Sequence, residues 1–97
     1  MAYDPGAIDQ ALSAAVGDDP ALIAELRAAF IHGVRTALDK MELARDAGEW
    51  RDRLLKLRGL AASFGAVRLA ALAAEAIHQP VGDARALRLL RRNVGRL

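Results

Sequence analysis

The sequence contains no cysteine, and only four of its 97 residues are aromatic and three are proline. Without cysteine, the chain has no disulfide framework, no thiolate nucleophile and no Cys-ligated zinc or iron–sulfur site. Two histidines are too few for most all-protein metal centres, so we expect no metal and no cofactor. There is no apolar run of roughly 18 residues and no signal-peptide pattern at the start, which favours a cytoplasmic protein without membrane contact.

Alanine and leucine are what the chain has in abundance, with 22 and 15 copies, whereas Val, Ile and Thr together number 10. Alanine and leucine are strong helix formers, and β-branched and aromatic residues are the usual material of strands. With 54% hydrophobic and 27% charged residues, 97 positions can bury one core. The composition therefore predicts an all-α fold with a single domain over residues 1–97.

Proline, glycine and aspartate divide the chain into five predicted helices. Asp4-Pro5 and Asp19-Pro20 each place a side-chain acceptor before a proline, as at the start of a helix, and Asp83 is a third such acceptor. Apolar residues spaced three and four apart then predict helices over about residues 5–16, 20–47, 49–65, 66–78 and 84–97. Short connections make neighbouring helices antiparallel, so we expect an up-and-down four-helix bundle with an additional short helix.

Charge is divided unevenly along the chain, although the net charge is only +2. Residues 1–50 carry nine acids and four bases, and residues 51–97 carry three acids and ten bases. The basic half either meets an anionic partner or is complemented by the acidic half within the bundle.

A small outward surface is predicted around Gly59, in the middle of the third predicted helix. A glycine at such a position destabilises a helix by about 1 kcal/mol relative to alanine, so its missing side chain calls for a reason other than helix stability. At about 100° per residue, Leu55, Gly59 and Ala62 lie together on the side away from the buried stripe, with Arg51 and Arg58 beside them.

This segment resembles the histidine-containing phosphotransfer (HPt) domain of two-component phosphorelays. The family pattern is His-x-x-Lys/Arg-Gly-x-x-x-x-Leu/Phe-Gly-Ala, and Arg58, Gly59, Phe64, Gly65 and Ala66 match it in register. The resemblance implies that the histidine accepts a phosphoryl group from an aspartate of a receiver domain. It also implies that the cation faces the phosphate and that the glycine lets the partner approach.

The position of the family's histidine is occupied by Leu55, which has no nucleophile and no titratable nitrogen. The resemblance therefore implies the fold and a docking surface, but no phosphoryl transfer and no enzymatic activity. We expect the chain to dock a response-regulator receiver domain, or a histidine kinase, without being phosphorylated at the usual site. The predicted docking surface, called the Leu55 face below, consists of Arg51, Leu55, Lys56, Arg58, Gly59 and Ala62.

Two other functions remain open at this point. The chain is an active phosphotransfer intermediate if His32 or His78 accepts the phosphoryl group, although both are better explained as surface or helix-capping histidines. It binds nucleic acid or another anionic partner if the arginine-rich last helix is the interface, although no aromatic residues accompany those arginines. A homodimer that covers Leu55 is a further alternative.

Overall fold

The computed structural model describes residues 6–97, and within that range the chain forms five α-helices and no strand. The all-α prediction is confirmed. The predicted Asp4-Pro5 helix start lies outside the described residues. The helices are α1 (Gly6–Val16), α2 (Pro20–Glu42), α3 (Ala47–Ser63), α4 (Val67–Ala76) and α5 (Ala84–Gly95).

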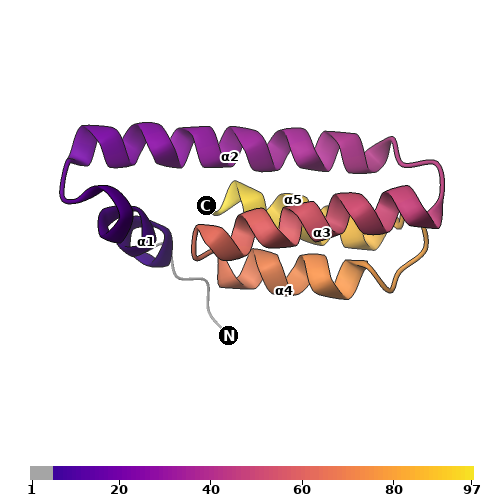
Figure 1. Ribbon diagram of the computed structural model, residues 1–97. Coiled ribbons are helices and arrows are strands. Elements are labelled where there is room, and N and C mark those ends of the chain that lie inside the picture. Colours follow the sequence, from indigo (N-terminus) through magenta and orange to yellow (C-terminus); the bar gives the residue numbers. More distant parts are fainter. Residues whose placement is uncertain (1–5) are drawn as a thin grey trace.

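Helices α2 to α5 lie side by side, and successive helices run in opposite directions (Figure 1). The long α2 packs against α3 and α5, and α4 packs against the same two helices. Helix α1 lies at an angle near the start of α2 and packs on it. No helix within residues 6–97 is long and apolar enough to cross a membrane.

Side-chain caps define where α2 and α5 begin. The Asp19 carboxylate accepts the backbone N–H groups of Ala21 and Leu22, at 3.1 and 3.2 Å, and Pro20 is the first residue of α2. Asp83 accepts the N–H of Ala86 at 2.9 Å at the start of α5. Each carboxylate satisfies backbone donors that have no partner inside the helix, so the predicted starts at Asp19 and Asp83 are confirmed.

The end of α2 was predicted wrongly. Helix α2 ends at Glu42 rather than near Ala47, and α3 begins at Ala47 rather than near Glu49. The cause is Asp46, which caps α3 by accepting the N–H of Glu49, while the Glu49 carboxylate accepts the N–H of Arg45, both at 2.9 Å. These two hydrogen bonds stabilise a helix start where the apolar spacing predicted that α2 continues.

The core contains buried side chains from all five helices, and most of them belong to α2, α3, α4 and α5. The Trp50 indole N–H donates to the Ala76 carbonyl at 2.9 Å, which joins α3 to the end of α4. The rings of Phe30 and Phe64 stack with their centroids 4.6 Å apart. The fully covered large side chains are Ile8, Val34, Leu38, Met41, Trp50, Leu54, Leu57, Leu69 and Leu90.

Candidate functional site: the outward face of α3

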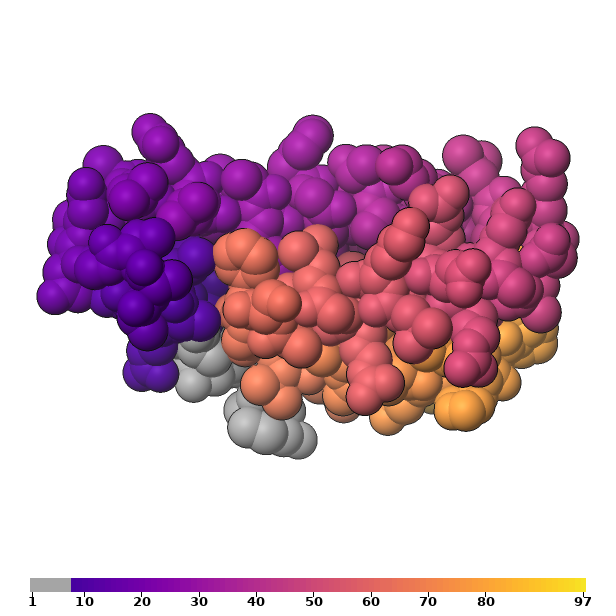
Figure 2. Space-filling model, viewed as in Figure 1, coloured from indigo at the N-terminus to yellow at the C-terminus, as the bar shows by residue number. Residues whose placement is uncertain are grey.

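The structure places all six residues of the Leu55 face on α3, and each of them is exposed. Helix α3 lies on the side of the molecule turned toward the viewer, between α2 and α4 (Figure 2). Its buried residues, Trp50, Leu54, Leu57 and Ala61, form the opposite face of the helix. The sequence spacing therefore predicted correctly which side of α3 meets solvent.

A shallow apolar strip runs along the middle of this face. Leu55, Gly59 and Ala62 follow one another at helical spacings of four and three residues, which places them in line. The Leu55 side chain is 40% exposed. A Cβ added at Gly59 would meet no atom within 4 Å, so packing within the described part of the fold does not require glycine there.

Cations lie on both sides of the strip, and the exposed Asp52 adds a negative charge on the side of Lys56. A Cβ built at Gly33 of α2 would lie 3.8 Å from the Leu60 side chain, so Leu60 marks the side of α3 that faces α2, and rotation by about 100° per residue puts Arg51 and Arg58 on the opposite side, toward α4. Lys56 lies on the other side, toward α2. Within residues 6–97, the ion pairs involve Arg27 and Arg91 and none of these three cations. Their charge therefore remains available to a partner.

Gly65 and Ala66, which match the HPt pattern, have a structural role at the end of α3. The Ala66 N–H donates to the Ala61 carbonyl at 2.9 Å and the Gly65 N–H to the Ala62 carbonyl at 3.2 Å. This is a Schellman motif, and Gly65 has the positive φ of 74° that the motif requires. Part of the resemblance thus follows from how the helix ends, whereas Gly59 has no such explanation.

Val67 is an exposed apolar residue that the sequence reasoning missed. It is the first residue of α4, follows the Gly65 turn directly, and is 63% exposed. The sequence did contain a signal that Val67 is exposed. Val67 and the exposed Ala71 are four residues apart and share one side of α4, whereas the buried Leu69 lies on another side. Helix α4 therefore also exposes apolar side chains on its outer side.

The two histidines lie outside α3 and both are exposed. His32 is on α2, as predicted. His78 lies beyond α4 rather than in its last turn, because α4 ends at Ala76 and Ile77 is its C-cap. Within residues 6–97, no three His, Asp or Glu side chains come together in a way that could hold a metal ion.

The arginines of α5 are partly complemented by acidic residues of α2. Arg91 pairs with Asp39 at 2.9 Å and with Glu42 at 2.7 Å. The hydrogen bonds that Asp39 and then Glu42 accept raise the pKa of Arg91 above its ordinary value. The remaining arginines of this segment are exposed and are Arg85, Arg88, Arg92 and Arg96.

Comparison of the chain with protein-family models, with curated proteins and with solved structures found no match. Any functional assignment therefore depends on the residues of this chain and their arrangement.

Proposed function

We propose that the chain is an HPt-like signalling module that docks a response-regulator receiver domain, or a related partner such as a histidine kinase, through the Leu55 face. It carries out no phosphoryl transfer itself and needs no cofactor. We further propose that α2 to α5 are the antiparallel four-helix bundle of this family and that α1 is the additional helix. Their alternating directions and the Arg58-Gly59 match support this assignment.

The observation that carries the proposal is the combination of Leu55 with Gly59. Leu55 stands where the family has its phosphate acceptor and still exposes 40% of its surface. Covering that remaining surface with a partner contributes about 1 kcal/mol to binding, because a leucine that becomes fully buried gains about 1.5–3 kcal/mol. Open space over Gly59 lets a partner's backbone come close to the strip.

Charge determines the kind of partner that fits. Arg51, Lys56 and Arg58 form no ion pairs within the described residues, and they surround an apolar strip. A partner that combines acidic groups with an apolar rim complements this arrangement, and opposite charge on the two surfaces raises the rate of association. A receiver domain that offers its acidic pocket is the partner the resemblance implies.

Gly59→Gln tests the docking surface, and Gly95→Gln is its matched control. Neither glycine has a positive φ, and a Cβ at either meets no atom within 4 Å, so both variants should fold. Gln at position 59 places a side chain across the strip, so we expect the affinity for a receiver domain to fall at least about tenfold by this clash. Gly95→Gln should bind as the parent chain does. Isothermal titration against each receiver domain encoded in the same genome measures both affinities.

Equal affinities of the two variants would contradict docking at the Leu55 face. The alternative of an anionic partner is supported by the exposed arginines of α5, and Arg88→Glu with Arg92→Glu tests it. Loss of binding in that double variant, with affinity that falls steeply as salt rises, would identify α5 as the interface. A dimer whose dissociation follows Gly59→Gln would instead show that a second copy covers Leu55.

A further inference from the structure

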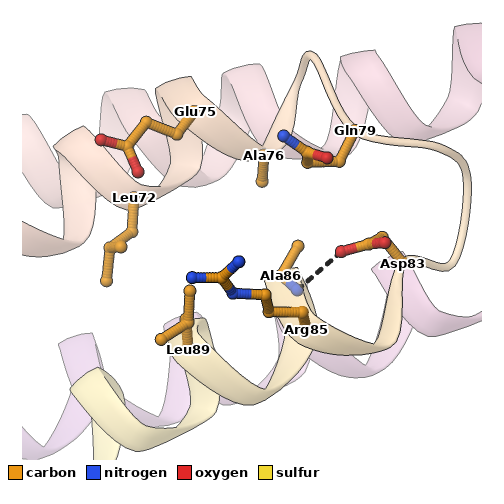
Figure 3. A pocket seen from close by; sticks show the side chains of 8 residues that line it. All are labelled: Leu72, Glu75, Ala76, Gln79, Asp83, Arg85, Ala86 and Leu89. Carbon is orange, nitrogen blue, oxygen red and sulfur yellow. Dashed lines mark hydrogen bonds between the residues drawn. The ribbon is translucent and has the colours of Figure 1, made fainter.

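A pocket of about 250 Å³ opens between α4 and α5 (Figure 3), and none of its lining residues belongs to the Leu55 face. Its floor is made of Ala76 and Ala86, which are 3% and 7% exposed. Both facing residues are small, so the two helices leave a space there that larger side chains would fill. Leu72 and Leu89 form an apolar wall at one end.

Two opposite charges enter this pocket from different helices. Glu75 extends from α4 and Arg85 from α5, and the charged ends of both point toward the Leu72 and Leu89 end (Figure 3). No ion pair joins Glu75 to Arg85 in the structure. The carboxylate and the guanidinium therefore both face the pocket with their charges uncompensated by each other.

The other end of the pocket is polar, and a hydrogen bond at the start of α5 fixes its backbone. Gln79 directs its amide into the space from the connection that follows α4 (Figure 3). Asp83 lies beside it, but its carboxylate is engaged in capping α5 through the Ala86 N–H at 2.9 Å. The connection turns at Gly82, whose φ of 74° favours glycine. The polar end is thus held by the same contacts that start α5.

We infer that this pocket binds a small zwitterion of amino-acid size. The ligand's ammonium group pairs with Glu75, its carboxylate with Arg85, and its apolar part packs on Leu72 and Leu89. The volume lies below the roughly 300–1,000 Å³ of pockets that hold drug-sized ligands, which fits a smaller molecule. Glu75 and Arg85 are exposed, so solvent weakens both charge contacts and the dissociation constant should be on the order of 1 mM.

Nuclear magnetic resonance of the ¹⁵N-labelled chain tests the inference with L-leucine and glycine as probes. We expect saturable shifts of the amide signals of residues 72–89. The indole N–H of Trp50, the only tryptophan, should shift as well, because it donates to the carbonyl of Ala76 on the pocket floor. N-acetyl-L-leucine lacks the ammonium group and L-leucinamide lacks the carboxylate, so each should bind about two- to fivefold more weakly, because each exposed charge contact contributes at most about 1 kcal/mol.

Variants separate the pocket from general surface charge. Glu75→Gln and Arg85→Gln should each weaken L-leucine binding about as much as removal of the matching ligand charge. Arg88→Gln is the matched control, because Arg88 is an exposed arginine of the same helix that does not line the pocket. It should leave binding unchanged. Circular dichroism confirms that all three variants remain helical.

Three results would overturn the inference. The first is a spectrum that neither L-leucine nor glycine perturbs. The second is equal binding of L-leucine and its two analogues. The third is an interaction energy between Glu75 and Arg85, measured by a double-mutant cycle of unfolding free energies, that stays the same when ligand is added. It would show that the two side chains neutralise each other across the pocket. None of these results bears on receiver docking, because the pocket and the Leu55 face involve different residues.

Discussion

Leu55→His should place an imidazole where the HPt pattern has one, at little cost in stability. About three-fifths of the surface of Leu55 is covered, since 40% of the residue is exposed. Full burial of a leucine is worth about 1.5–3 kcal/mol, so loss of the whole side chain would cost about 1–2 kcal/mol. The imidazole keeps part of these contacts, and the expected fall in the free energy of unfolding is therefore about 1 kcal/mol or less. For a domain of this size that equals a decrease in Tm of at most about 4–8 °C.

The same variant should gain phosphoryl acceptance. The imidazole would stand three residues before Arg58 and four before Gly59, as in the family pattern. An imidazole nitrogen then attacks the phosphorus of the receiver's aspartyl phosphate, a P–N bond forms, and the bond between phosphorus and the aspartate oxygen breaks. The receiver's carboxylate is the leaving group. Incubation with a ³²P-labelled receiver domain should leave an acid-labile, base-stable label on Leu55→His.

Leu55→Ala is the matched control, because it removes the same contacts without adding an acceptor. It and the parent chain should take up no label. A loss of more than about 3 kcal/mol in Leu55→His, measured by urea unfolding, would refute the reasoning that this side chain lies on the surface. Label on the parent chain at His32 or His78 would refute the proposal that the chain takes no part in phosphoryl transfer.

Two further predictions concern stability. Gly59→Ala should raise the free energy of unfolding by about 1 kcal/mol, because the site is helical and open, whereas Gly65→Ala should lower it by about 1–2 kcal/mol, because its φ is 74°. Urea titrations of the two variants should thus move in opposite directions, and a shift of the same sign in both would contradict the assigned backbone geometry. Arg91→Gln should lower stability by about 0.2–1 kcal/mol at low salt, because its ion pairs with α2 are partly exposed. The difference from the parent chain should disappear near 1 M salt, and a difference that persists there would show that Arg91 acts mainly by packing.

The starts of α2 and α5 were predictable because each depends on a few neighbouring residues. Asp19-Pro20 marks the start of α2 by chemistry that needs nothing outside the helix. The end of α2 was missed although a signal was present, since Asp46 and Glu49 have the spacing of a capping pair. Apolar periodicity favoured a longer helix, and the local hydrogen bonds of Asp46 outweighed it.

Of the two candidate sites, the one that depends on local helical spacing was predictable and the one that depends on packing between helices was not. The outward direction of Leu55 followed from helical spacing, but its exposed fraction depends on neighbouring helices that spacing does not describe. The pocket between α4 and α5 was beyond reach of the sequence, because it depends on which alanines of two helices face each other. Nothing in the order of residues shows that Glu75 and Arg85 enter one space.

Arg27 of α2 links two segments from opposite ends of the chain. Its guanidinium donates to the Asp9 carboxylate of α1 at 2.6 Å and also to the backbone carbonyl of Leu97 beyond α5. When α1 detaches from α2, Arg27 loses one partner and becomes free to leave the other. Helix α1 and the last turn of α5 should therefore open together as one cooperative unit in hydrogen exchange, ahead of the Trp50 region. Local unfolding of α1 and of the end of α5 would then occur together, although the two segments are far apart in the sequence, because both depend on Arg27.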